Sequence, residues 1–115
     1  MRRGEVWSLN LDPTIGAEMR KTRPVVIVND DAIGSLPLRV VVPLTEWNER
    51  YAQAPWMVHV PARPGNGLEK TSAADTFQVR SVAKERFVRR LGTLSGAEMK
   101  AVGRALALVL RIGQA

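Results

Sequence analysis

The amino-acid sequence predicts a mainly β fold with one helix: a small, strongly bent antiparallel sheet, or partly open barrel, followed by a C-terminal helix. The chain has 115 residues, about one domain's worth, so residues 1–115 are expected to form a single domain. Five or six short runs have the apolar pattern of strands, and only the last long segment has a helical one. Because no helical segments separate the runs, parallel βαβ units are excluded.

The first predicted strand is Glu5–Leu11, in which Trp7, Leu9 and Leu11 share one face. It ends at Asp12–Gly16, where a proline and a glycine predict a loop.

Two further runs, Pro24–Val28 and Leu38–Leu44, are rich in β-branched residues and almost continuously apolar. Strands covered on both faces have this character, so we expect these two to form the centre of the sheet. Asn29, the two aspartates after it and Gly34 predict the turn between them.

The second half of the chain predicts three more strands and the helix. The predicted strands are Trp56–Val60, Ala73–Arg80 and Phe87–Leu94, with Ser81–Arg86 as one helical turn between the last two. Ser95 and Glu98 have the spacing of a capping box, and apolar residues then recur every three or four positions to about Arg111.

The composition excludes several classes of protein. The chain has no cysteine, which excludes a disulfide scaffold, a thiol nucleophile and a Cys-ligated metal, and it has one histidine, His59. A glycine-rich phosphate loop, a paired-histidine metal motif and a Gly-x-Ser-x-Gly elbow are also missing from the sequence, so we expect no cofactor and no metal. No run approaches the ~18–20 apolar residues of a membrane span, and we expect a cytoplasmic protein without a membrane partner.

The net charge of +6 is unevenly distributed. Residues 1–75 hold nine basic and nine acidic side chains, whereas residues 76–115 hold eight basic side chains against two glutamates. Such a concentration of positive charge is typical of a protein that binds nucleic acid or another polyanion, although a basic surface without a ligand would have the same composition.

Arg23 and Thr45 are the first candidate pair. Arg23 begins a predicted central strand, and Thr45 follows the end of the other. If the two strands pair as a hairpin, the start of one lies across from the end of the other, which would place a guanidinium and a hydroxyl about one phosphate. A hydroxyl at a strand end is otherwise usually a turn former.

Three other groups of candidates come from the loop, from a later strand and from the tryptophans. The loop after the first strand contains Gly16, Glu18, Arg20 and Lys21, which could equally be a solvated charged loop. Among the later residues, Gln78 and Arg80 would share one strand face and, with Ser72, could contact RNA bases and phosphates. His59 is expected to be structural or on the surface, Trp7 and Trp56 are at positions typical of a core, and Trp47 is the expected stacking platform for a base.

At these residues the sequence resembles the MazF/PemK family of bacterial toxin ribonucleases. The matching blocks follow in family order along nearly the whole chain: Arg3-Gly4-Glu5-Val6-Trp7, Leu11-Asp12-Pro13, Gly16-x-Glu18, Arg23-Pro24-Val25-Val26-Ile27-Val28, Leu44-Thr45, Gly67-Leu68, and then Ser72, Gln78, Arg80 and Arg86. The resemblance implies an SH3-like β-barrel with a C-terminal helix, assembled as a homodimer. Phe77 stands where relatives often have an acidic residue, and Glu46-Trp47 follows Thr45 in place of small polar residues, so no RNA recognition sequence is carried over from the family.

The resemblance also implies a function. It implies metal-independent, sequence-specific cleavage of single-stranded RNA by 2′-hydroxyl attack, leaving 2′,3′-cyclic phosphate and 5′-hydroxyl ends, and neutralisation by a cognate MazE-like antitoxin. The residues carried over as catalytic are Arg23, Thr45 and Glu18, and those expected to bind RNA are Gly16, Arg20, Lys21, Trp47, Ser72, Gln78 and Arg80. Because arginine stays protonated, we expect Arg23 to stabilise the charge of the transition state, Thr45 to orient a phosphate oxygen and Glu18 to act as the base.

Two alternative functions remain at this level. One is a non-enzymatic toxin on the same barrel, resembling CcdB, which binds DNA gyrase. The other is a nucleic-acid-binding module that has salt-dependent affinity for RNA and forms no product. Arg23, Thr45 and the Gln78-x-Arg80 segment favour the ribonuclease, because a gyrase poison has no need of them.

Overall fold

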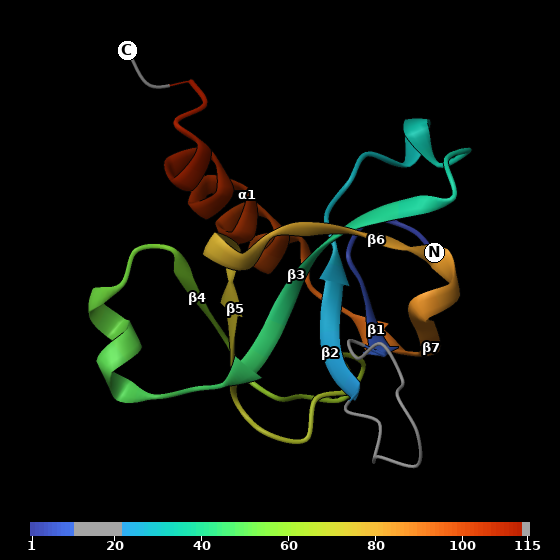
Figure 1. The fold of residues 1–115 in the computed structure, drawn as a ribbon. Helices are drawn as coiled ribbons and strands as arrows, with labels where there is room; N and C mark the ends of the chain where they lie inside the picture. Colours follow the sequence, from blue (N-terminus) through green and yellow to red (C-terminus); the bar gives the residue numbers. More distant parts are fainter. Residues whose placement is uncertain (11–21, 114–115) are drawn as a thin grey trace, which may run out of the picture.

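The computed structural model describes residues 1–10 and 22–113. Its strands are β1 (Glu5–Asn10), β2 (Thr22–Ile27), β3 (Leu38–Glu46), β4 (Met57–Val60), β5 (Ser72–Asp75), β6 (Arg80–Ala83) and β7 (Phe87–Thr93). One α-helix, α1 (Gly96–Leu110), follows them, and the 3-10 helices in the described segments are η1 (Asp31–Ile33), η2 (Glu49–Gln53), η3 (Thr76–Gln78) and η4 (Lys84–Arg86). The predicted mainly β fold with a C-terminal helix is confirmed (Figure 1).

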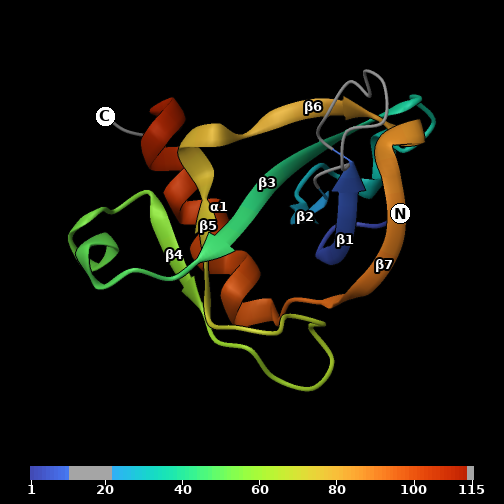
Figure 2. The ribbon, with the colours of Figure 1, turned by 60° about the horizontal axis from the view of Figure 1, so that its bottom comes forward.

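The strands form one bent antiparallel sheet, in the order β4-β5-β3-β2-β1-β7, with β6 paired to β3. The long strand β3 makes the bend possible, because its first half pairs with β6 and its last residues pair with β5. Figures 1 and 2 show the sheet curving around this strand. Since the order ends at β4 and β7 in the described part of the chain, the sheet is a partly open barrel and not a closed one.

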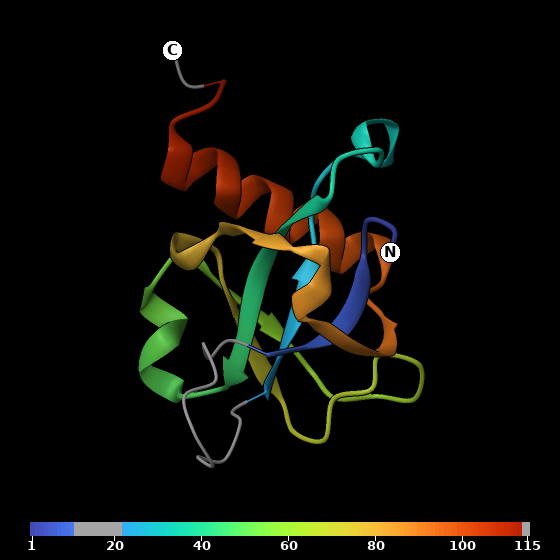
Figure 3. The ribbon, with the colours of Figure 1, turned by 45° about the vertical axis from the view of Figure 1, so that its right-hand side comes forward.

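Both faces of the central strand β2 are buried, as its apolar sequence predicts. Val26 and Val28 belong to a core cluster that includes Val102 of α1, so α1 covers this face (Figure 3). Val25 and Ile27 point the other way, into a second cluster with Leu9, Val41 and Val82. The alternation follows from the two-residue repeat of a strand, and it explains why Pro24–Val28 has no polar face.

The capping box predicted at the start of α1 is confirmed. The Ser95 hydroxyl accepts a hydrogen bond from the Glu98 backbone N–H at 3.1 Å, and the Glu98 carboxylate accepts one from the Ser95 backbone N–H at 3.0 Å. The helix ends at Arg111, which adopts the left-handed conformation with φ 56° and closes the last turn. Of the described helices, none is long and apolar enough to cross a membrane.

The predicted strand Ala73–Arg80 is wrong: it is two strands separated by η3. Asp75 ends β5, and its carboxylate accepts a hydrogen bond from the Phe77 backbone N–H at 3.2 Å, which caps the 3-10 turn. The Thr76 hydroxyl donates to the Trp56 carbonyl at 2.6 Å and fixes the turn beside β4. Because β6 then begins at Arg80, the predicted helical turn Ser81–Arg86 is reduced to η4.

The core positions predicted for two tryptophans are partly wrong. Trp7 is half-buried and packs edge-on against Phe87, with 5.8 Å between the ring centroids. Trp56, however, is 38% exposed, because β4 begins only at the next residue and Trp56 lies in the turn before it. Its side chain is therefore outside the alternating pattern from which a core position was inferred.

Candidate functional site

Arg23 and Thr45 lie across from each other at one edge of the sheet. Val25 pairs with Pro43 in the antiparallel register of β2 and β3, and continuing that register by two residues brings Arg23 opposite Thr45. The hairpin predicted from the sequence is therefore confirmed, and it brings the guanidinium-bearing and hydroxyl-bearing residues to one place. Arg23 is exposed and Thr45 is half-buried.

A first hollow, of about 420 Å³, lies over the face of the sheet that carries Val25 and Val41. Four of the residues predicted from the sequence line it, namely Arg23, Thr45, Gln78 and Arg80. Its other lining residues are Leu9, Val25, Val41, Pro43, Tyr51, Met57 and Asp75. The first hollow thus has an apolar floor, formed by the core of the sheet, and polar groups from β2, β3, η3 and β6 around it.

A second hollow, of about 580 Å³, adjoins the same edge of the sheet. It is lined by Ser8, Thr22, Arg23, Pro24, Leu44, Thr45, Glu46, Gly67, Leu68, Glu69, Lys70, Ser72, Arg89 and Leu91. Arg23 and Thr45 are the two residues that it shares with the first hollow. The other residues of these strand ends are divided between the hollows, because successive side chains of a strand point to opposite faces. Val25 and Pro43 line the first hollow, whereas their neighbours Pro24 and Leu44 line the second.

The positive charges at the two hollows are mostly unpaired. In the described part of the chain, no ion pair involves Arg23, Arg80 or Arg89, whereas Lys70 pairs with Glu46 at 3.6 Å. Elsewhere on the basic C-terminal segment, Arg90 pairs with Glu5 at 3.6 Å. Of the basic residues in the C-terminal segment, Arg80 therefore lines the first hollow and Arg89 lines the second.

The structure adds a carboxylate that the sequence analysis did not single out. Asp75 is 8% exposed, lines the first hollow and accepts a hydrogen bond from the Gln78 side-chain amide at 2.8 Å. Gln78 is thereby held in a defined orientation at the rim. The apolar pattern of a strand does not indicate this role. A signal that could have indicated it is the short polar side chain of Asp75 three residues before Gln78, which is a spacing typical of a capped turn.

Two of the predicted RNA-binding residues are in different surroundings from those expected. Ser72 is buried, and its hydroxyl donates to the Lys70 carbonyl at 2.9 Å while the residue lines the second hollow. Trp47 lines neither hollow: it is half-buried and meets His59 and Tyr51 edge-on, with centroids at 4.6 and 5.9 Å. His59 is exposed on β4, as expected of a surface residue. The candidates Gly16, Glu18, Arg20 and Lys21 lie outside the described residues.

This arrangement suits a phosphodiester. A guanidinium offers a planar set of N–H donors to phosphate oxygens, and a hydroxyl across the strands can donate to another oxygen of the same group. The described residues contain no cluster of three or more His, Asp or Glu side chains that could hold a metal ion.

Comparisons with known proteins agree with one another. Residues 2–110 match the family described as "PemK-like, MazF-like toxin of type II toxin-antitoxin system". The chain is 36% identical over 116 residues to "Endoribonuclease MazF9" of Mycobacterium tuberculosis, covering 96% of both proteins. A MazE–MazF structure from Deinococcus radiodurans has a TM-score of 0.78 at 22% identity, over 98% of this chain and 97% of that one. An endoribonuclease in complex with its cognate antitoxin from a mycobacterial species has a TM-score of 0.77 at 22% identity, over 100% and 99% of the two chains.

Proposed function

The chain belongs to the family of PemK-like, MazF-like toxins of type II toxin–antitoxin systems, and from this premise we propose that Arg23 and Thr45 are its catalytic residues for cutting single-stranded RNA. It is an endoribonuclease of that family, as its 36% identical relative is named. The observation that carries the assignment of residues is the position of Arg23 and Thr45, which are shared by two adjoining hollows.

An RNA strand that crosses this edge of the sheet would have nucleotides in both hollows and one phosphate between them. Gln78 and Arg80 border the first hollow, and Ser72 and Arg89 border the second. We assign these side chains to holding the strand on either side of the reacting phosphate. Arg89 extends the set of RNA-binding residues beyond those expected from the sequence.

The reaction that we propose needs no metal ion. The 2′-hydroxyl loses its proton and attacks the adjacent phosphorus, the bond from phosphorus to the 5′-oxygen breaks, and this oxygen takes up a proton from water. The products have a 2′,3′-cyclic phosphate and a 5′-hydroxyl. The phosphorane that forms on the way carries extra negative charge, which a permanently protonated arginine stabilises. Arg23 supplies this charge, Thr45 orients a phosphate oxygen, and Glu18, which precedes β2 in the sequence, takes the 2′-hydroxyl proton.

A cleavage assay tests this proposal. Purified protein is incubated with long single-stranded RNA in excess EDTA, and the fragment ends are mapped. Removal of one transition-state donor costs about 10²–10³-fold in rate, so we expect losses of this size for Arg23→Ala and Thr45→Ala and partial retention for Arg23→Lys. Glu18→Gln should flatten the acid limb of the pH–rate profile, and an unchanged acid limb would remove Glu18 as the base.

Lys100→Ala is the matched control, because Lys100 is an exposed cation on α1 that lines neither hollow. Equal loss of rate in this variant would mean that only overall charge matters. Failure of the folded wild-type protein to cut any of many RNA sequences would refute the proposed reaction, and inhibition of DNA gyrase would then be measured.

We further propose that the toxin works in the cytoplasm as a homodimer and is neutralised by a cognate MazE-like antitoxin that covers the RNA hollows. Leu108 and Leu110 on α1 support a second copy as a partner, because both are apolar, both are exposed and neither belongs to a core cluster of the described chain. Sedimentation analysis of the purified toxin gives its mass, and a monomer at micromolar concentration would contradict the dimer.

A further inference from the structure

Two exposed aromatic side chains lie together beside the first hollow. The Phe77 side chain of η3 is 68% exposed and Trp56, just before β4, is 38% exposed. Their ring centroids are 6.1 Å apart with an angle of 65° between the planes. Neither residue lines the two hollows, so the pair is a separate surface feature, which we call the aromatic pair.

The fold holds the aromatic pair in place. Thr76, which is fully buried, donates hydrogen bonds to the Trp56 carbonyl from its hydroxyl at 2.6 Å and from its backbone N–H at 3.2 Å. Asp75 caps the same turn through the Phe77 backbone N–H. The two rings therefore project from backbone segments that are tied to each other, and little entropy would be lost when a ligand contacts them.

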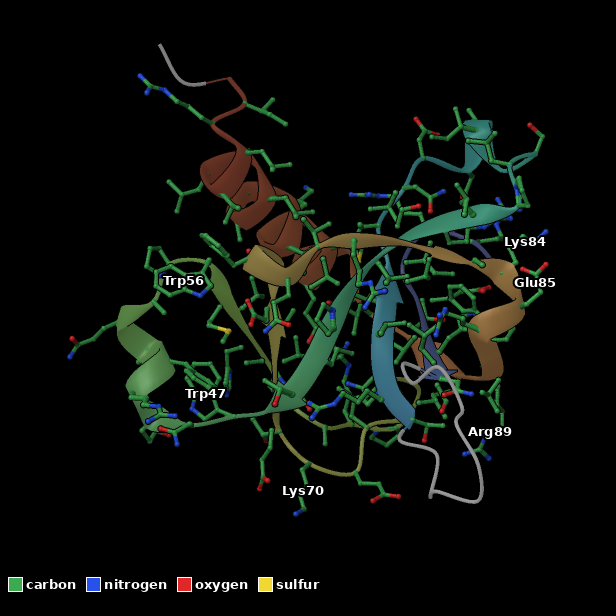
Figure 4. All side chains as sticks on the ribbon, in the orientation of Figure 1. Trp47, Trp56, Lys70, Lys84, Glu85 and Arg89 are labelled. Carbon is green, nitrogen blue, oxygen red and sulfur yellow. The ribbon has the colours of Figure 1, made fainter. Side chains whose placement is uncertain are left out.

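The aromatic pair continues the first hollow. Met57 and Gln78, the residues that directly follow Trp56 and Phe77, both line that hollow. Figure 4 shows Trp56 at the end of η2 next to η3, while Trp47 lies at the other end of η2. A strand of RNA that leaves the first hollow past Gln78 thus meets the aromatic pair next.

The surrounding charges favour a polyanion. Arg80 at the start of β6 lines the first hollow, and no ion pair among the described residues involves it. The single carboxylate among the described lining residues of the first hollow, that of Asp75, is 8% exposed and accepts hydrogen bonds from the Phe77 backbone N–H and the Gln78 side-chain amide. Aromatic rings next to free cations are the usual composition of a site for single-stranded nucleic acid, in which bases stack on the rings and phosphates meet the cations.

We propose that Trp56 and Phe77 form a stacking platform for one nucleobase of the RNA substrate, next to the nucleotides held by Gln78 and Arg80. This inference rests on the proposed ribonuclease function and adds to it a subsite that determines affinity. The platform does not contact the reacting phosphate, so it acts on substrate binding and not on the chemical step. The continuity of the aromatic pair with the first hollow, which the proposed function assigns to RNA, favours a nucleotide as the occupant.

The test uses the RNA site mapped in the cleavage assay and a 2′-O-methyl copy of that site, which cannot be cut. Base–aromatic stacking contributes ~1–3 kcal/mol per base, so Phe77→Ala and Trp56→Ala should each raise the Kd for the 2′-O-methyl RNA by about tenfold. The KM for cleavage should rise with it while kcat changes less than about twofold. Phe77→Tyr, which keeps the ring, should bind as the wild type does. Leu36→Ala, at another exposed apolar side chain far from η3 in sequence, is the control.

An abasic scan identifies the stacked base. Each nucleotide flanking the cut is replaced in turn by an abasic one, and at one position this should weaken wild-type binding about tenfold without weakening binding by Phe77→Ala any further. Wild-type affinity in Phe77→Ala, or full additivity at every abasic position, would overturn the platform while the wild-type enzyme still cuts RNA. The platform is also refuted if Phe77→Ala binds RNA normally and loses affinity only for the antitoxin. A wild-type protein that cuts no RNA would instead refute the proposed function.

Discussion

Gly92 of β7 packs directly against the backbone of Gly65 and Asn66, and its replacement by alanine should be strongly destabilising. A Cβ atom on Gly92 would lie 2.3 Å from the Gly65 carbonyl oxygen and 2.5 Å from the Asn66 carbonyl carbon. Ordinary van der Waals contact with a Cβ atom begins at 3.4 Å, so the segment that contains Gly65 and Asn66 would have to move away from β7 by about 1.1 Å. Both atoms belong to the backbone, so no side-chain rotation can relieve the clash.

The free-energy cost of this movement comes from the contacts that it breaks. The Thr93 backbone N–H donates to the Gly65 carbonyl at 2.8 Å, and this bond would be lost. Asn66 is fully buried, and its side chain bonds to Pro61, Arg63 and Leu68 of the same loop. A lost hydrogen bond of about 1 kcal/mol and overpacking of about 1–3 kcal/mol give a destabilisation of ~2–4 kcal/mol, or ~10–20 °C in Tm.

The assay is thermal unfolding followed by circular dichroism, at equal protein concentration. Gly103→Ala on α1 is the matched control: it adds the same methyl group where nothing lies within 4 Å. There the lower flexibility of alanine should stabilise the helix by ~0.5–1 kcal/mol and raise Tm by a few degrees. If Gly92→Ala melts within about 2 °C of the wild type, the steric argument is refuted.

Two further predictions concern carboxylates that fix the local structure. The Arg63 guanidinium, and the Ser95 backbone and hydroxyl, hold the pKa of Glu98 below its ordinary value of 4.5 against the opposing effect of burial. A lowered folded-state pKa stabilises the protein fully above about pH 4.5 and progressively less as the pH falls below it. Glu98→Gln should therefore lower Tm at pH 7, and the difference in Tm between variant and wild type should shrink as the pH is lowered below 4.5; a difference that does not change with pH would contradict this. Asp75→Ala removes the cap of η3 and the partner of the Gln78 amide, and should cost ~1–2 kcal/mol in denaturant unfolding. Asp75→Asn, which keeps a cap acceptor, should cost less, and equal costs for the two variants would argue against a capping role.

The parts of the fold that follow a simple repeat could be predicted from the sequence. The continuous apolar run Pro24–Val28 predicts a strand buried on both faces, and β2 has this environment. The spacing of Ser95 and Glu98 predicts the start of α1, and the capping box is formed. The pairing of Arg23 with Thr45 follows from an antiparallel hairpin between two strands near in sequence, and the register supports it.

The parts that depend on a local capping bond or on a strand's first residue could not be predicted in the same way. The run Ala73–Arg80 has the composition of one strand, but one hydrogen bond from Phe77 to Asp75 turns its middle into η3. Trp56 has a core-type spacing with Val58 and Val60, yet β4 starts one residue later and Trp56 is exposed. Such choices are decided by bonds to distant backbone, such as that between Thr76 and Trp56, which no periodic pattern contains.

The sequence by itself determined the strand and helix composition, the family resemblance and the pair Arg23–Thr45, because hydrophobic periodicity and short motifs are local properties of the chain. Only the tertiary structure decided that this pair is shared by two hollows, that Asp75 holds Gln78, and that the exposed rings beside the first hollow are Trp56 and Phe77. The physical reason is that these features join β2, β3, β4, η3 and β7, whose positions relative to one another are set by the bend of the sheet and by packing on α1.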